Sequence, residues 1–171
     1  HLLQNNWEWN LAEIRVLRAL FYYWGIDNWG NIPYSVDFTD RELPEQKDRV
    51  FMFSFIEKEI LDNVEKLQTM PGPDYYGRVT KGMAYTLLAK LYLNAETWIG
   101  QNMYQKAVDA CDQVIALNAY SIEDDYFANF KVYNEASVEN IFVIPNHTVY
   151  TKDRMYWYTL TLNDASRATF N

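Results

Sequence analysis

The stretch that most constrains the fold of this chain is GRVTKGMAYTLLAKLYLNAE, at residues 77–96. Its apolar residues recur at the i, i+3, i+4, i+7 spacing of one helical face, and further apolar residues widen that face until little polar surface is left. The stripe comprises Met83, Ala84, Leu87, Leu88, Leu91, Tyr92 and Ala95. Thr80 is the expected N-cap, and Gly100 the expected stop. The pattern predicts a helix packed between other helices.

Three more helical patterns accompany this one. We expect helices at residues 11–24, 50–67 and 103–117, with Gly30 and Pro33 ending the first of them. The last has an apolar stripe formed by Tyr104, Ala107, Val108, Cys111, Val114 and Ile115. Cys111 is the only cysteine, so no disulfide forms within these residues, and its place in the stripe predicts a buried thiol.

The chain divides into a helical part and an irregular part. Residues 1–118 are expected to form a scaffold of two helix pairs, at about 8–68 and 80–118. Residues 119–171 are rich in aromatic side chains, with short strands expected at ENIFVIP (139–145) and MYWYTLTL (155–162). Since the chain begins at His1 and enters amphipathic sequence almost at once, we expect a piece of a longer protein.

Charge and composition limit the partners. A net charge of −8 argues against binding to nucleic acid or to an anionic membrane surface, both of which need a positive surface. Aromatic residues make up 17% of the chain, more than a helical core requires, which indicates extensive ring packing or a binding face.

A weak internal sequence repeat suggests that both helix pairs share one arrangement. Shifted against itself, the chain aligns Leu17 with Leu87, Ala19 with Ala89, Tyr22 with Tyr92, Gly30 with Gly100 and Tyr34 with Tyr104. The order of Leu88, Ala89 and Tyr92, followed by Tyr104, Ala107 and Cys111, matches the packing order of a tetratricopeptide repeat, although the connection is longer than usual. One interpretation is therefore a tetratricopeptide-type interaction module that binds a peptide or protein partner.

The order of the motifs resembles another group more specifically. AEIRVLRALFYYW, WGNIPYS, GRVTKGMAYTLLAKLYLNAE, YQKAVDACDQVI and ENIFVI follow one another as in the SusD/RagB family of outer-membrane glycan-binding lipoproteins. The resemblance implies a mainly α fold, with tetratricopeptide-like antiparallel helix pairs in a right-handed array and a short β or irregular C-terminal part. It also implies that this chain is the middle portion of the protein.

The same resemblance implies a function without catalysis or cofactor. Members bind oligosaccharide or polysaccharide on the extracellular face of the outer membrane and deliver it to a partner TonB-dependent, SusC-like transporter for nutrient uptake. They are held there by an N-terminal lipid anchor, which this chain does not contain. In starch-binding members, aromatic residues after the ENIFVI-type strand contribute to the sugar platform.

The corresponding segment here supplies rings and hydrogen-bonding groups. Sugar C–H faces stack on aromatic rings, and side-chain hydrogen bonds fix the orientation of the sugar. The candidate glycan-binding residues are Tyr150, Tyr156, Trp157 and Tyr158 for stacking, and Asn146 and Arg154 for hydrogen bonds. In a regular strand Tyr156 and Tyr158 share one face and Trp157 takes the other, so packing on a core is the alternative for some of these rings.

Other conspicuous residues have simpler explanations. Trp7, Trp9, Trp24 and Trp29 are expected to pack within the helical array, whereas Trp98 suits either packing or a partner-facing edge. The acidic run Glu123, Asp124 and Asp125 lacks EF-hand spacing and predicts a solvated turn, and His147 is isolated. With no nucleophile-elbow, phosphate-loop or zinc-helix motif, we expect no catalytic residue and no metal site.

Overall fold

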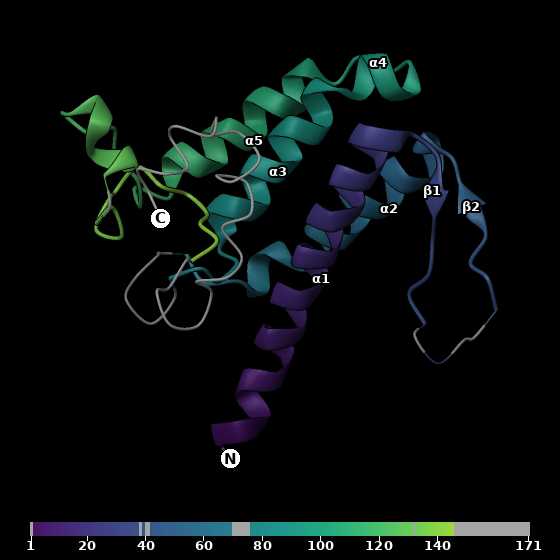
Figure 1. Ribbon diagram of the computed structural model, residues 1–171, viewed down its shortest axis with the longest axis horizontal. Coiled ribbons are helices and arrows are strands. Elements are labelled where there is room, and N and C mark those ends of the chain that lie inside the picture. Colours follow the sequence, from purple (N-terminus) through teal and green to yellow (C-terminus); the bar gives the residue numbers. More distant parts are fainter. Residues whose placement is uncertain (1, 38, 40–41, 70–75, 132, 146–171) are drawn as a thin grey trace, which may run out of the picture.

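The computed structural model describes residues 2–37, 39, 42–69, 76–131 and 133–145. Its longer helices are α1 (Leu2–Trp29), α2 (Arg49–Leu61), α3 (Lys81–Leu93) and α5 (Tyr104–Ala116). Shorter elements are α4 (Ala95–Ile99), the 3-10 helices η1 (Val64–Lys66) and η3 (Tyr126–Phe130), and the strands β1 (Ile32–Pro33) and β2 (Gln46–Lys47) (Figure 1). The expected mainly α, helix-array fold is confirmed.

The core lies where these helices cross. Figure 1 shows α3 and α5 side by side, with α1 crossing α2, and these two pairs make the most extensive contacts between elements. The largest apolar side chains fully removed from solvent come from α1, α2 and α3: Val16, Ile26, Met52, Phe53, Ile56, Ile60 and Leu91. Burial of each such side chain stabilises the fold by about 1.5–3 kcal/mol, before the entropy of ordering the chain is subtracted.

Helix α3 follows its prediction closely. Thr80 is the N-cap, and its hydroxyl accepts a hydrogen bond from the Met83 amide. Every residue of the predicted stripe is buried, from Met83 to Ala95. Asn94 separates α3 from α4, and Gly100 ends α4 in the left-handed conformation with φ 70°.

Helix α1 extends beyond its prediction in both directions, because no proline interrupts residues 2–29 and Gly25 is accommodated within the helix. The amide of Gly30, whose φ is +77°, donates to the carbonyl of Ile26 and ends the helix. The chain then forms a small antiparallel sheet, in which Ile32 pairs with Lys47 and Pro33 with Gln46. The predicted helix stop at Gly30 is confirmed, whereas this strand pairing was not predicted.

Helix α2 is shorter than predicted, because the buried Asn63 redirects the chain. The Asn63 side chain donates to the carbonyl of Glu59 at 2.7 Å and accepts from Arg15 at 3.4 Å. Competition of this kind between an asparagine side chain and the backbone favours a helix end. Residues 64–66 accordingly form the separate turn η1.

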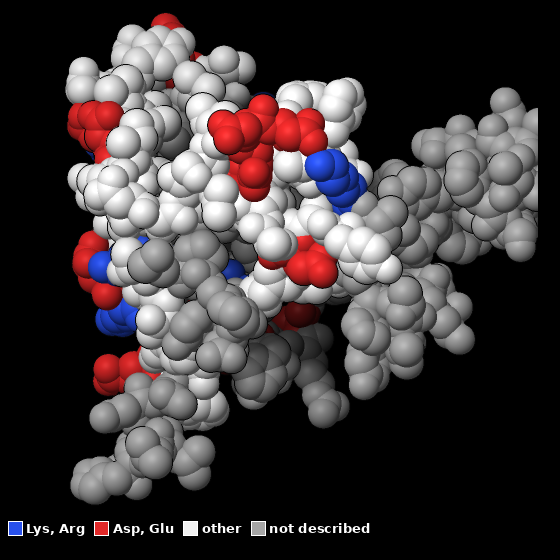
Figure 2. All heavy atoms as spheres, turned by 90° about the vertical axis from the view of Figure 1, so that its left-hand side faces the viewer, with Lys and Arg blue, Asp and Glu red and all other residues white. Residues whose placement is uncertain are grey.

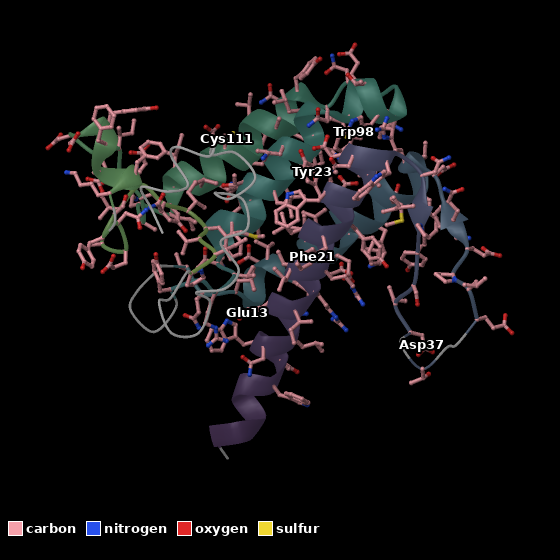
Figure 3. All side chains as sticks on the ribbon, in the orientation of Figure 1. Glu13, Phe21, Tyr23, Asp37, Trp98 and Cys111 are labelled. Carbon is pink, nitrogen blue, oxygen red and sulfur yellow. The ribbon has the colours of Figure 1, made fainter. Side chains whose placement is uncertain are left out.

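The predicted buried stripe of α5 is only partly correct. Ala107 and Ala110 are the buried residues of this helix, whereas Cys111 is exposed and Ile115 is 71% exposed. Alanines let α5 approach α3 closely, so the helix turns its smaller face inward. The prediction of a buried thiol at Cys111, labelled in Figure 3, is wrong for the described part of the chain.

The strand predicted at residues 139–145 is also wrong. These residues form bends with no strand pairing among the described residues, and Ile141 and Phe142 pack their side chains against the core. An apolar run without a neighbouring strand satisfies its hydrophobicity by such packing instead of by a ladder. The second predicted strand, at 155–162, lies outside the described residues. None of the described helices combines the length and apolar character needed to cross a membrane.

Candidate functional site

The predicted glycan-binding residues lie beyond the described part of the chain. Asn146, Tyr150, Arg154, Tyr156, Trp157 and Tyr158 are all outside it, so their grouping stays a prediction. The structure does describe most of the segment that leads to them, residues 117–131 and 133–145, and this segment has a defined attachment to the helical array.

The leading segment is attached at the beginning of α3. The Tyr120 hydroxyl lies 3.1 Å from the Thr80 hydroxyl, and a Cβ on Gly82 would collide with the Tyr120 ring. Farther along the segment, a Cβ on Gly77 would lie 2.5 Å from Cγ of Pro145. The irregular segment therefore packs directly on both glycines of the GRVTKG motif, on Gly82 near its start and on Gly77 at its described end. We call these two glycine positions the seats of the segment.

Three exposed rings form the η3 aromatic cluster, which we define as Tyr126, Phe127 and Phe130. Their side chains are 73%, 67% and 70% exposed. The Tyr126 ring meets Phe127 edge-on at a centroid distance of 5.3 Å and lies 5.5 Å from Phe130. From the sequence, these rings were recognised only as part of the aromatic-rich residues 119–171. Their close spacing beside an acidic run was the signal that they share an exposed turn.

Carboxylates hold this turn in shape. Asp125 accepts a hydrogen bond from the Phe127 amide at 3.0 Å and pairs with Lys131 at 2.7 Å. The hydrogen bond from Lys131 is the main cause that lowers the pKa of Asp125. Glu139 accepts from the amide of Glu123 and from the side chain of Asn129. These hydrogen bonds join residues far apart in the segment and form a polar frame at η3.

The acidic side chains of this region form no metal cluster. In Figure 2, which looks onto the side of the molecule that carries η3, acidic side chains gather in a patch surrounded by mostly uncharged surface. Within the described ranges, no three His, Cys, Asp or Glu side chains are grouped so that they could hold a metal ion. Asp125 and Glu139 instead use their oxygens on amides and on Lys131.

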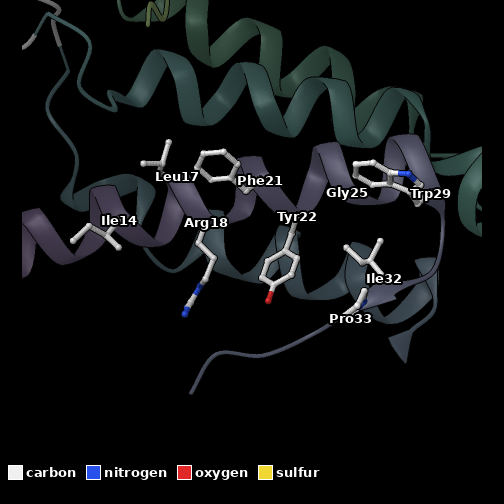
Figure 4. A pocket seen from close by; sticks show the side chains of 9 residues that line it. All are labelled: Ile14, Leu17, Arg18, Phe21, Tyr22, Gly25, Trp29, Ile32 and Pro33. Carbon is white, nitrogen blue, oxygen red and sulfur yellow. The ribbon is translucent and has the colours of Figure 1, made fainter. Parts of the chain in front are cut away.

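A second surface feature, the α1 groove, runs beside α1 and has a volume of about 540 Å³ (Figure 4). Gly25 leaves room for Ile32 on this side of α1, because a Cβ there would lie 2.7 Å from Cδ1 of Ile32 and the Ile32 side chain would have to shift. The side chains and backbone that line the groove belong to Ile14, Leu17, Arg18, Phe21, Tyr22, Gly25, Trp29, Ile32 and Pro33.

The polar side chains that line the groove, Arg18 and Tyr22, already have hydrogen-bond partners within the fold. The Arg18 guanidinium donates two hydrogen bonds to the Glu59 carboxylate, at 2.9 and 2.6 Å. The Tyr22 hydroxyl donates to the Ser35 carbonyl at 2.6 Å and accepts from the Ser35 amide. Since these groups are already bonded within the fold, the groove suits apolar side chains better than sugar hydroxyls.

The tryptophans do not all pack as expected. Trp7 and Trp29 are 77% and 75% exposed, so the prediction that they pack within the array is wrong for the described structure. Trp9 lies under the Arg78 guanidinium at 4.2 Å. Trp98 is partly buried and packs on Tyr23 with a centroid distance of 5.5 Å, so it takes part in the packing of the helices (Figure 3).

Arg78 ties the loop before α3 to α1. It donates two hydrogen bonds to Glu13, at 3.1 and 3.0 Å, and one to Asn10 at 2.9 Å. Burial raises the pKa of the Glu13 carboxyl more than the hydrogen bond and charge of Arg78 lower it. The Arg78–Glu13 pair therefore holds α1 against the loop that leads from Gly77 into α3.

Comparisons with known proteins identify the type of fold. No family model matches the chain. The chain is, however, 35% identical over 124 residues to the starch-binding protein SusD of Bacteroides thetaiotaomicron. Over this span the chain belongs to the SusD-like family. The match covers 72% of this chain and 22% of SusD, so the chain spans about a fifth of its relative's length.

Solved SusD-like structures superpose on most of the chain. One is surface glycan-binding protein A from Bacteroides thetaiotaomicron in complex with laminarihexaose, with 27% identity and a TM-score of 0.67. It is matched over 81% of this chain and 28% of its own. Another is NanU of Bacteroides fragilis, with 22% identity and a TM-score of 0.73 over 85% of this chain and 30% of its own. The second likeness concerns the fold alone.

Proposed function

We propose that the whole protein binds glycans without catalysis and delivers them to a TonB-dependent, SusC-like transporter. The observation that carries this proposal is the 35% identity to the starch-binding protein SusD. The similarity to a glycan-binding protein crystallised with laminarihexaose supports oligosaccharide as the ligand class. In this proposal the helical array is the scaffold, and the irregular segment holds the sugar.

The proposed platform lies in the segment after Pro145. Tyr150, Tyr156, Trp157 and Tyr158 would stack on sugar faces, and Asn146 and Arg154 would supply hydrogen bonds. The η3 aromatic cluster belongs to the same irregular segment and offers further exposed rings. Its polar frame also includes asparagine and carboxylate groups of the kind that bind hydroxyls. The α1 groove lacks that combination.

Calorimetric titration of the full-length protein tests this proposal. We expect binding to one class of a panel that includes laminari-oligosaccharides and malto-oligosaccharides, with no cleavage products detected by chromatography after prolonged incubation. Trp157→Ala and Tyr156→Ala remove stacking faces and should each weaken binding roughly 3- to 10-fold. Trp7→Ala is the matched control, because Trp7 is an exposed tryptophan on α1, and it should leave affinity unchanged.

One outcome would contradict the proposed function, and another would contradict only the proposed position of the platform. A well-folded full-length protein that binds no glycan would favour the tetratricopeptide-type module, with a peptide or protein as its ligand. Binding that survives both tail substitutions but is lost in Phe127→Ala would keep the function and move the platform to the η3 aromatic cluster.

The proposed location is the extracellular face of the outer membrane, reached through an N-terminal lipid anchor outside this chain. Protease added to intact cells should then digest the protein while periplasmic markers stay whole. Protection of the protein until the outer membrane is permeabilised would contradict this location.

A further inference from the structure

We propose that the α1 groove is an internal helix–helix interface, filled in the whole protein by an amphipathic helix of the same polypeptide from outside residues 1–171. This proposal does not depend on the identity of any glycan. It concerns how the described helices connect to the rest of the fold.

Helix α1 has two apolar faces, of which only one is covered. Ala12, Val16, Ala19 and Ile26 on the first face are fully buried. On the second face, Ile14 is 63%, Phe21 60% and Trp29 75% exposed. A helix that is apolar on all sides is typical of the interior of a fold, and contiguous exposed apolar surface usually marks an interface. The second face therefore lacks its neighbour among the described residues.

The shape of the uncovered face suits a helix. Ile14, Phe21 and Gly25 lie along one face of the helix, about two turns and then one turn apart, and the distance from Ile14 to Trp29 along the axis is about 22 Å at 1.5 Å per residue. At Gly25 the Ile32 side chain packs directly against the helix, and Ile32 and Pro33 form one wall of the groove along which a facing helix can lie. Ridges of one helix pack into such grooves of another.

The chemistry of the groove selects an apolar occupant. The Arg18 charge is neutralised by Glu59 at 2.6 Å, so no acidic partner is needed. The Tyr22 hydroxyl is likewise bonded to Ser35. The occupant we infer is a helix whose Leu, Ile, Val or aromatic residues recur at i, i+3, i+4 and i+7.

The same polypeptide is the source that the comparisons favour. The chain spans 22% of SusD and 28% and 30% of two solved SusD-like proteins, so a whole protein of this kind contains several times more chain. In an array of helix pairs, each inner helix packs against neighbours on both sides. Helix α3 contacts both α2 and α5, whereas α1 packs mainly on α2.

Thiol labelling of the full-length protein tests the inference. Cys111→Ser, together with replacement of any cysteine outside these residues, provides the background. Ile14→Cys and Phe21→Cys place a thiol in the groove, and Asp27→Cys places one on an exposed position of the same helix as the control. We expect both groove thiols to react with a maleimide about tenfold or more slowly than the control, at every protein concentration and without partners.

Crosslinking then identifies the occupant. Benzoylphenylalanine in place of Phe21 keeps an aromatic side chain there and should form an adduct with an amphipathic segment outside residues 1–171. Ile14→Cys is the milder thiol variant, so a folding failure of Phe21→Cys leaves the test intact.

Several results would overturn the inference. Groove thiols that react as fast as the Asp27→Cys control would show an open surface. Protection that increases with protein concentration would indicate a second copy, and protection that appears only when purified transporter is added would indicate an external partner. An adduct within residues 146–171 would place this chain's own tail in the groove.

Discussion

Tyr120 lies over Gly82 so closely that no other residue fits at position 82 without displacing the Tyr120 ring. The Tyr120 hydroxyl also lies 3.1 Å from the hydroxyl of Thr80, the N-cap of α3. A residue beyond the end of α5 thus returns to the first turn of α3. The contact joins the irregular segment to the helical array.

Substitution of Gly82 by alanine should reveal this contact, because its effect on the free energy of unfolding should change sign when the Tyr120 ring is removed. Gly82→Ala forces the Tyr120 ring to move and should lower the free energy of unfolding by about 1–3 kcal/mol. In a Tyr120→Ala background the same change should stabilise by about 0.5–1 kcal/mol, because alanine is the better helix former. Urea unfolding of the four proteins of this cycle measures the coupling. Equal effects in both backgrounds would contradict the contact.

The hydroxyl of Thr80 serves the cap and Tyr120 together. Thr80→Val keeps the shape but removes the hydroxyl that accepts from the Met83 amide, and should cost about 1–2 kcal/mol of unfolding free energy. Thr80→Ser retains the hydroxyl and is the matched comparison. Circular dichroism during urea unfolding measures both, and a Ser variant less stable than the Val variant would count against the capping role.

Removal of Arg78 should leave a largely buried carboxylate unpaired. The Glu13 side chain is only 12% exposed, so Arg78→Ala should cost about 3 kcal/mol near neutral pH. Glu13→Gln in the same variant removes the charge and should restore part of the loss. Urea midpoints of wild type and both variants measure these changes.

The pH dependence of the stability of the Arg78→Ala variant follows from the direction in which burial shifts the pKa of Glu13. Burial raises the pKa of Glu13 above its ordinary 4.5 in the folded protein, so the folded state takes up the proton before the unfolded state does. The deficit of the variant should therefore shrink as the pH falls through the raised pKa towards 4.5. A deficit that stays constant from pH 7 to pH 4.5 would argue against an unpaired Glu13 charge.

Tyr85 should make the fold sensitive to alkali. Burial and the hydrogen bond to Glu65 raise the pKa of Tyr85 from 10.0 to about 12. Because the folded pKa is raised, this stability is fully present below pH 10 and is lost as the pH rises towards about 12. Tyr85→Phe should show a shallower fall of the urea midpoint between pH 9.5 and about 12 than wild type. Parallel curves would contradict a shifted tyrosine.

Local signals explain which parts of the fold could be predicted from the sequence. Gly30, Thr80 and Gly100 mark helix ends through backbone conformation or capping, which depend on few neighbours, and all three predictions are confirmed. The stripe of α3 was predictable because the helix is covered on nearly every side. The family resemblance rested on these same segments.

The wrong or missing predictions concern features that depend on residues distant in the sequence. The stripe of α5 offered an alanine face and a larger apolar face, and periodicity alone does not say which one meets α3. Cys111 was therefore misplaced. The seats at Gly77 and Gly82 depend on contacts with Pro145 and Tyr120, which are distant in sequence. The proposed glycan platform after Pro145 lies outside the described residues and stays a prediction.

The two glycine seats also bear on how such a protein diversifies. Since Tyr120 and Pro145 both return to the start of α3, the chain between them leaves and re-enters the scaffold at nearly one place. Lengthening a loop with fixed ends costs little additional entropy, about 0.6 kcal/mol for each doubling of its length. Residues 121–140 can therefore be exchanged for another sequence, in evolution or by design, while the helices keep their register, provided that both seats remain glycine and that Ile141 and Phe142 keep their packing against the core.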